Sequence, residues 1–262
     1  MMVKITATKA HGTQNHFLIF YTHNNQKIIQ KNIPTIISKV NAKRIDGVLI
    51  LSDSKVADFK MDYYNNDGTW ETMCANGARC AVLFMYQKEI INNKKMTFEA
   101  GDGVHHSEII QDDYVKLKML PPKYCSSEIQ LLGVKGFHID SGATHFTVEY
   151  PKITDQEVRR LGAQIRYDKI FSPRGINVNF YEIINTNNIY VKTYEKGIEN
   201  LMMSCGSGAV ACAFHLYQIK KIQAPLKVNV PGGELQIDFI QDWKDVWLSG
   251  PAKIEFNINL EL

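Results

Sequence analysis

The chain has 262 residues, of which 45% are hydrophobic and 22% charged, the usage of an ordinary globular protein. Its 30 basic and 27 acidic residues leave a net charge of +3, too small to indicate nucleic acid or an anionic membrane as a partner. No run of residues reaches the roughly 18 apolar positions that span a bilayer, and the first residues lack the apolar core of a secretory signal, so a cytoplasmic protein is expected.

Most segments predict short strands, because they are rich in β-branched and aromatic residues and are bounded by turn residues. In chain order, the clearest are 17–21, 47–51, 115–119, 177–180 and 189–193. Two segments predict helices, at 77–89 and 208–221, and both are apolar on nearly every side. A helix without a polar face must be enclosed, so we expect strands around one central helix, twice over.

Three short motifs recur in the same order about half a chain later. Cys74-Ala75-Asn76-Gly77 matches Cys205-Gly206-Ser207-Gly208, residues 12–17 match 142–146, and residues 100–103 match 231–234. The repetition predicts a duplicated domain. We expect a first half at 1–119, completed by a C-terminal strand at 250–262, and a second half at 120–249.

The five cysteines fit neither a disulfide framework nor a structural zinc site. Their number is odd, no two form a C-x-x-C pair, and no histidine stands at zinc-finger spacing, so no metal is expected. Cys80 and Cys212 inside the apolar helices, and Cys125 in a loop, are assigned to packing.

Cys74 and Cys205 differ because each precedes the first turn of an enclosed helix. The unpaired N–H groups and the dipole at a helix start favour a thiolate and also cradle a carboxylate. Small neighbours, among them Gly77 and Gly208, are expected to let a ligand approach the backbone. If a pseudo-two-fold axis relates the halves, the two sulfurs flank one carbon. One thiolate then removes a proton and the other thiol returns one to the opposite face, which predicts racemisation or epimerisation without a cofactor.

The motifs around both cysteines resemble the signatures of the diaminopimelate epimerase family. The first signature lies at 65–80 and the second at 194–197 with 204–209, and supporting matches lie at 11–17, 175–180, 231–235 and 250–252. The resemblance implies an α+β fold of two pseudo-symmetric domains, each a β-barrel-like sheet around a central apolar helix, with the active site in the cleft between them. It also implies conversion of LL- to meso-2,6-diaminopimelate, a step toward lysine and peptidoglycan.

By the same resemblance, Cys74 and Cys205 are the acid/base pair, and His145 is an auxiliary residue that helps a thiol lose its proton. Backbone N–H groups near the two helix starts would bind the reacting carboxylate, and five polar side chains would recognise the amino groups and the distal carboxylate. The residues are Asn76, Gly77, Gly206 and Ser207 for the backbone contacts, and Asn15, Asn65, Asn177, Glu195 and Lys196 for the side-chain contacts. The expected partner is a small amino acid substrate, with a homodimer left open.

Three departures from the family pattern keep alternatives open. Ala75 replaces a usual glycine, Lys196 replaces an arginine, and Ala143 lies in a segment that differs from the family's. Since the last two concern the distal end of the substrate, a racemase of another amino acid on the same scaffold is the alternative. A non-catalytic binding protein is a third hypothesis, which the intact cysteine pair disfavours. The pair also argues against a related isomerase family that shares the fold without it.

Overall fold

The computed structural model describes residues 3–40 and 44–262, so Met1 and Met2, part of the segment considered for a secretory leader, lie outside it. The chain divides into two compact units, one formed by the residues up to Leu117 with Gly250–Leu262 and the other by Lys118–Ser249. Among the described residues, no helix combines the length and the apolar character that a bilayer crossing requires.

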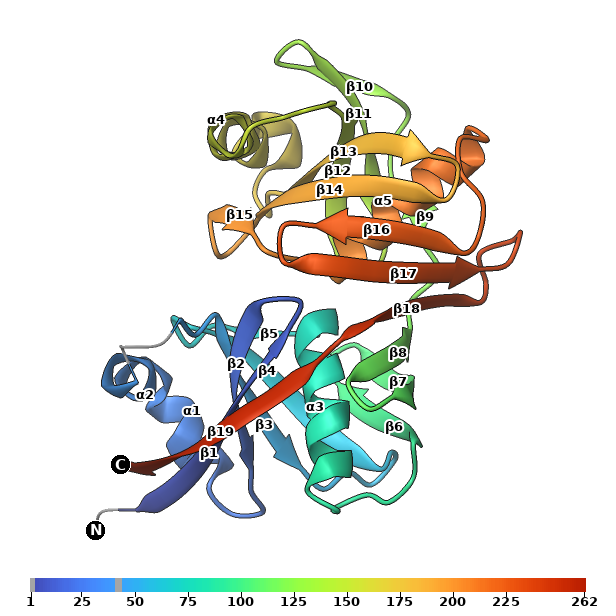
Figure 1. Cartoon of the computed structure of the whole chain (residues 1–262). Coiled ribbons are helices and arrows are strands. Elements are labelled where there is room, and N and C mark those ends of the chain that lie inside the picture. The colour runs from blue at the N-terminus through green and yellow to red at the C-terminus, as the bar shows by residue number, and fades with distance from the viewer. Residues whose placement is uncertain (1–2, 41–43) are drawn as a thin grey trace. The chain divides into compact units, whose positions relative to one another are not determined.

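The first unit is a sheet in which the order of strands is β19-β1-β2-β3-β4-β6-β7-β8 (Figure 1). The pairs β2/β3 and β4/β6 are parallel and the other pairs are antiparallel. The last strand of the chain thus returns to this unit beside the first. The strands are β1 (Lys4–Gly12), β2 (Asn15–Tyr21), β3 (Gly47–Ser52), β4 (Phe59–Asn65), β5 (Trp70–Glu71), β6 (Lys95–Ala100), β7 (Gly103–Gln111), β8 (Tyr114–Lys118) and β19 (Lys253–Glu261).

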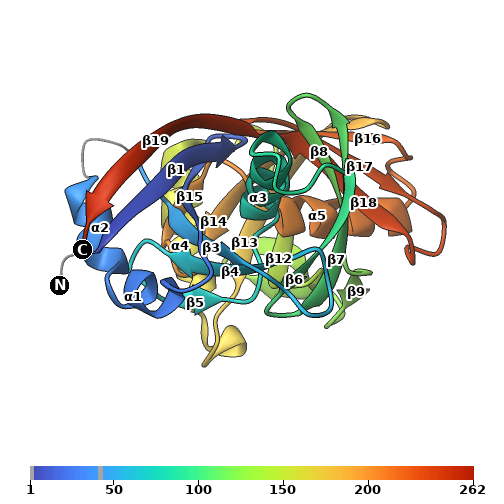
Figure 2. The same ribbon diagram turned by 90° about the horizontal axis from the view of Figure 1, so that it is seen from below.

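Helices cover both faces of this sheet, which is why every residue of β3 is buried. Successive strand residues point to opposite faces. Leu18 and Val48 join the cluster under α1 (Gln26–Lys31) and α2 (Ile33–Lys39), whereas the α-carbon of Gly77 in α3 (Ala75–Gln87) faces Phe17 and Leu49. In Figure 2, β1 and β3 accordingly lie between α1–α2 and α3. Helix α3 contacts strands β1, β2, β3, β4, β7 and β19.

The second unit repeats this topology. Its strand order is β11-β12-β13-β14-β16-β17-β18, with β12/β13 and β14/β16 parallel and the other pairs antiparallel. Strands β9 and β10 pair with β11, and β15 pairs with β14. The strands are β9 (Lys123–Tyr124), β10 (Ile129–Leu131), β11 (Val134–Asp140), β12 (Thr144–Glu149), β13 (Asn177–Asn185), β14 (Asn188–Glu195), β15 (Asn200–Met202), β16 (Leu226–Val230), β17 (Gly233–Phe239) and β18 (Val246–Pro251).

The two faces of the second sheet have different chemistry. Phe146 and Phe180 point into an apolar cluster under α4 (Asp155–Arg166), beside the short helix η1 (Lys169–Phe171). The alternate residues of the same strands lie on the face of α5 (Gly206–Gln218), and they include the polar residues His145, Asn177 and Asn179. Polar groups on a buried face need partners, so this face is where a polar site is built.

The predicted strands and central helices are confirmed, with shifted ends. Each predicted strand coincides with an observed one, although residue 119 lies beyond β8. Both central helices begin two residues before the predicted starts at 77 and 208. The helices that cover the other faces, α1, α2 and α4, were not predicted, so the picture of strands around one helix per half was incomplete.

Candidate active site

Cys74 and Cys205 occupy the same place in the two units. Each is the N-cap residue of its central helix, with φ −134° and ψ 116° at Cys74 and φ −133° and ψ 107° at Cys205. The first intrahelical bonds run from Ala78 N to Cys74 O and from Ala209 N to Cys205 O. Cys74 is partly exposed, whereas Cys205 is buried. The duplicated motif therefore places two thiols in one backbone conformation at two helix starts.

The first turns of α3 and α5 carry the backbone N–H groups that an α-helix leaves without an intrahelical acceptor. The side chains of the N-cap residues Cys74 and Cys205 make no capping hydrogen bond to them. A helix start of this kind favours an anion, so the predicted carboxylate contacts at Asn76, Gly77, Gly206 and Ser207 stay predictions. Ala75 has a negative φ, as a helical residue does, so its replacement of glycine costs nothing here.

Two of the glycines in these turns pack closely against the sheet. A Cβ on Gly77 would lie 2.9 Å from Leu49 Cδ2, and one on Gly208 would overlap Asn179 Oδ1. Close packing is therefore one reason why both residues are glycines. The expectation that they also let a ligand approach the backbone stays a prediction.

A chain of hydrogen bonds runs from β14 to the Cys205 sulfur. Thr193 Oγ1 donates to Asn179 Oδ1 at 2.9 Å, Asn179 Nδ2 donates to His145 Nδ1 at 3.0 Å, and His145 Nε2 lies 3.0 Å from Ser207 Oγ. Ser207 Oγ is 3.7 Å from Cys205 Sγ. Because Nδ1 accepts, Nε2 carries the ring proton and donates a hydrogen bond to Ser207 Oγ. In the contact between Ser207 Oγ and Cys205 Sγ either atom can be the donor.

His145 is therefore a donor to Ser207 and not the base that takes a proton from a thiol. Its side chain is fully buried, and burial lowers the pKa of the imidazole to about 3. At neutral pH the ring is neutral, and its one lone pair already accepts from Asn179. The expectation that His145 helps a thiol lose its proton stays a prediction, and the contact through which it would act is the Ser207 hydroxyl beside Cys205.

The buried imidazole makes stability depend on pH. The unfolded chain takes up a proton below about pH 6.5 and the folded chain does so only near pH 3, so the free energy of unfolding falls as the pH drops between these values, by up to about 1.4 kcal/mol per pH unit. The free energy of unfolding, measured with urea, should fall less between pH 7.5 and pH 5.0 in His145→Gln than in the unsubstituted protein. The expected difference between the two falls is about 2 kcal/mol. His106→Gln, at an exposed histidine, is the control. An unchanged pH dependence in His145→Gln would contradict the assignment.

In the first unit, Asn15 and Asn76 are linked side by side at the start of α3. Asn76 Nδ2 donates to Asn15 Oδ1 at 3.1 Å, and Asn15 Nδ2 donates to Asp46 Oδ2 at 2.9 Å. Asp46 also accepts from His16 N at 2.8 Å and from Arg44 Nε at 3.1 Å. The structure thus brings Asn15, Asn76 and Cys74 to one helix start, with the Asn15 amide held in one orientation.

The other predicted side chains divide into two groups. Asn65, at the end of β4, accepts from Tyr63 Oη at 2.8 Å and donates to Thr69 Oγ1 at 3.0 Å, so its amide holds the following turn. Asn177 Oδ1 accepts from Lys196 N at 2.9 Å, which joins the start of β13 to the end of β14, where Glu195 lies. The Lys196 ammonium makes no ion pair with any residue that the structure describes.

The remaining cysteines lie outside this chemistry. Cys80 and Cys212 are fully buried, and burial raises the pKa of both thiols, as expected of packing residues. Cys125 is exposed, so its assignment to packing is wrong. Across residues 3–40 and 44–262, no cluster of three or more His, Cys, Asp or Glu side chains is placed to hold a metal ion.

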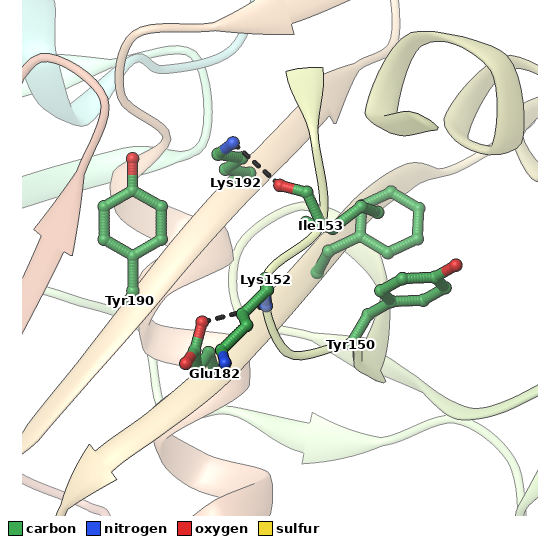
Figure 3. Close-up of a pocket in the computed structure, with 7 residues that line it drawn as sticks. Tyr150, Lys152, Ile153, Glu182, Tyr190 and Lys192 are labelled. Carbon is green, nitrogen blue, oxygen red and sulfur yellow. Dashed lines mark hydrogen bonds between the residues drawn. The ribbon is translucent and has the colours of Figure 1, made fainter. Parts of the chain in front are cut away.

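A separate pocket of about 190 Å³ lies in the second unit and contains none of the predicted site residues (Figure 3). Two of its charged groups have protein partners: Glu182 accepts from Lys152 N at 3.0 Å, and Lys192 Nζ donates to Ile153 O at 2.9 Å and to Asp155 at 2.7 Å. We therefore assign no part of the reaction to this pocket.

Comparison with protein families gives two matches to one family model, described as diaminopimelate epimerase, at residues 7–125 and 137–255. The chain belongs to the diaminopimelate epimerase family. The second match repeats the first with a shift of 130 positions, which supports two repeated domains.

Curated members of the family match over most of the chain. A diaminopimelate epimerase of Flavobacterium psychrophilum is 32% identical over 96% of this chain and 98% of its own length. One from Aquifex aeolicus is 37% identical over 78% and 76%. Among solved structures, a probable proline racemase from Agrobacterium radiobacter superposes with a TM-score of 0.75 at 14% identity, covering 97% of this chain and 92% of that one. That likeness shows the same mixed α/β fold.

Sequence reasoning missed three residues that shape the two helix starts: Arg79, Asn179 and Thr193. Asn179 and Thr193 are direct cross-strand partners and both are buried. Only the pairing of β13 with β14 brings them together, so no local pattern marks them. Arg79 carried a readable signal, since it is the one charged residue within the otherwise apolar run of α3.

Proposed function

We propose that this diaminopimelate epimerase inverts an α-carbon of LL-2,6-diaminopimelate through two thiols, Cys74 and Cys205. The observation that carries the proposal is the shared N-cap position and backbone conformation of the two cysteines on matching helices. Family membership and near full-length curated relatives support the reaction and the amino acid substrate.

The mechanism follows from what α-proton removal demands. One thiolate takes the proton from one face of the carbon, negative charge develops on the adjacent carboxylate, and the other thiol delivers a proton to the opposite face. The N–H groups of Asn76 and Gly77 in one unit, and of Gly206 and Ser207 in the other, stabilise that charge. With two helix starts carrying the charge, the proposal needs no cofactor.

This mechanism requires one site shared by both halves. We therefore propose domains at 1–119 with 250–262 and at 120–249, related by a pseudo-two-fold axis, with the substrate in a cleft between them. The division of the chain into two compact units of repeated topology supports this. Closure of the cleft would keep water from the carbanion, which is necessary for stereocontrol. A homodimer remains compatible with the site.

Recognition of the amino groups and the distal carboxylate is assigned to Asn15, Asn65, Asn177, Glu195 and Lys196. The contact between Asn177 and the Lys196 backbone supports a common subsite on β13 and β14. The Lys196 ammonium has no ion-pair partner among the described residues and is half-buried, so a substrate carboxylate is its natural counter-ion.

A racemase of another amino acid is the second candidate, because Lys196 offers a single point charge to the distal carboxylate instead of a bidentate fork. Solvent-deuterium incorporation into a panel of amino acids separates the two. We expect exchange in LL- and meso-diaminopimelate, and a kcat/KM about 10- to 100-fold lower in Lys196→Ala, with most of it retained in Lys196→Arg. Exchange confined to an amino acid without a second carboxylate would overturn the substrate assignment.

A further inference from the structure

Arg79 is a guanidinium group buried completely inside the first unit. Its N–H groups donate only to neutral acceptors: Thr13 Oγ1 at 2.8 Å, Asn76 Oδ1 at 2.9 Å, Ala75 O at 3.3 Å and Pro251 O at 3.4 Å. No carboxylate among the described residues forms an ion pair with it. A buried charge without a counter-ion is strongly unfavourable, so the group calls for a compensating anion.

The position of this cation makes the demand stronger. Two of its acceptors, on Ala75 and Asn76, belong to the first turn of α3. The helix dipole already places partial positive charge at that end. A guanidinium at the same end adds to the positive potential instead of compensating it, and an anion at the helix start is favoured by both.

Three titratable groups interact with Arg79: Cys74, Cys80 and Tyr114. Burial lowers the pKa of Arg79, while negative charge on any of the three raises it. Cys80 is fully buried and burial raises the pKa of its thiol, and a phenol such as Tyr114 ordinarily ionises only near pH 10. Glu255, which acts on Cys80, is already paired with Lys9 at 2.8 Å.

We propose that Arg79 is the counter-charge that holds Cys74 as the thiolate of the resting enzyme. The proposal rests on the two-thiol function and assigns its starting state. Cys74 S⁻ accepts the α-proton and becomes S–H, while Cys205 S–H gives its proton to the opposite face and becomes S⁻. The second helix carries Val210 where the first carries Arg79, and Cys205 meets the neutral hydroxyl of Ser207. Arg79 acts through Cys74 and is a positioning residue.

The test is the pH dependence of alkylation at each cysteine, read by mass spectrometry in the substrate-free protein. Cys125→Ser serves as the background, because it removes the exposed thiol outside the site. Iodoacetamide reacts with the thiolate, so the pH at which the alkylation rate is half-maximal (the midpoint) reports the ionisation of each cysteine. We expect the midpoint of Cys74 to lie at a lower pH than that of Cys205. Arg79→Gln should raise the Cys74 midpoint by about one pH unit, a roughly tenfold slower reaction at pH 7, whereas Arg79→Lys should keep the lower midpoint. Lys9→Gln, which removes another buried cation of the same unit, should move it little.

A Cys205 midpoint at or below that of Cys74, or an unmoved Cys74 midpoint in Arg79→Gln, would overturn the proposal. If Arg79→Gln does not fold, the comparison of the two cysteines in the background protein decides. Turnover is measured on the same samples. Shifted midpoints without epimerisation would refute the two-thiol function alone, and epimerisation with an ordinary Cys74 midpoint would refute the counter-charge alone.

Discussion

Cys74→Ala and Cys205→Ala are each expected to lower epimerisation of LL-diaminopimelate by at least about 10³-fold while the fold persists. Inversion needs an acceptor on one face of the α-carbon and a donor on the other, so neither thiol alone completes it. Proton exchange without inversion should survive in each variant for the stereoisomer whose α-hydrogen faces the remaining cysteine. The measurement is stereoisomer analysis of the product, with deuterium content from solvent as the second readout.

Cys125→Ser is the matched control for these variants, because it removes an exposed thiol at no helix start. It should keep full activity. Circular dichroism and urea unfolding should show little change in the two alanine variants. Cys74 is only partly buried, and Cys205 is the N-cap residue at the start of its helix. Near-normal turnover in either variant would show that the two-base assignment is mistaken.

Oxidation is expected to inactivate the substrate-free enzyme completely and reversibly. If both sulfurs contact the same substrate carbon from opposite faces, they face each other when the substrate is absent. A thiolate at Cys74 then attacks an oxidised Cys205 readily. Diamide should abolish activity, dithiothreitol should restore it, and a substrate analogue should protect. The burial of Cys80 and Cys212 leaves Cys125 as the competing thiol, which the Cys125→Ser background removes.

Peptide mapping under non-reducing conditions identifies the product of this oxidation. A Cys74–Cys205 disulfide within one chain is the expected species. Retention of full activity after diamide treatment, or a disulfide that joins other cysteines only, would argue against the facing arrangement of the two thiols.

The features of this molecule that could be predicted are those determined by residues close together in the sequence. The largely apolar runs after Cys74 and Cys205 predict the central helices, and the recurrence of the motifs predicts the duplicated domain. Both helices begin earlier than expected. The sequence pattern places their starts too late because residues such as Asn76 and Ser207 favour caps and turns in isolation. Helix α4 carried an overlooked signal: Thr154 and Glu157 form a capping box, with Thr154 Oγ1 accepting from Glu157 N at 3.2 Å.

The parts that escaped prediction depend on contacts between distant segments. The partners of His145 are set by the pairing of β12 with β13, which places Asn179 against one ring nitrogen while Ser207 contacts the other. The importance of Arg79 appears only once the absence of a carboxylate partner within the described residues is known. Neither fact is encoded in the spacing of residues.

The most direct test of the central claim is a single-turnover reaction of LL-diaminopimelate in deuterium oxide, analysed at low conversion. Two thiols on opposite faces require deuterium in the newly formed meso product and almost none in the recovered LL substrate. Deuterium in both, at comparable rates, would show one base serving both faces and would contradict the account.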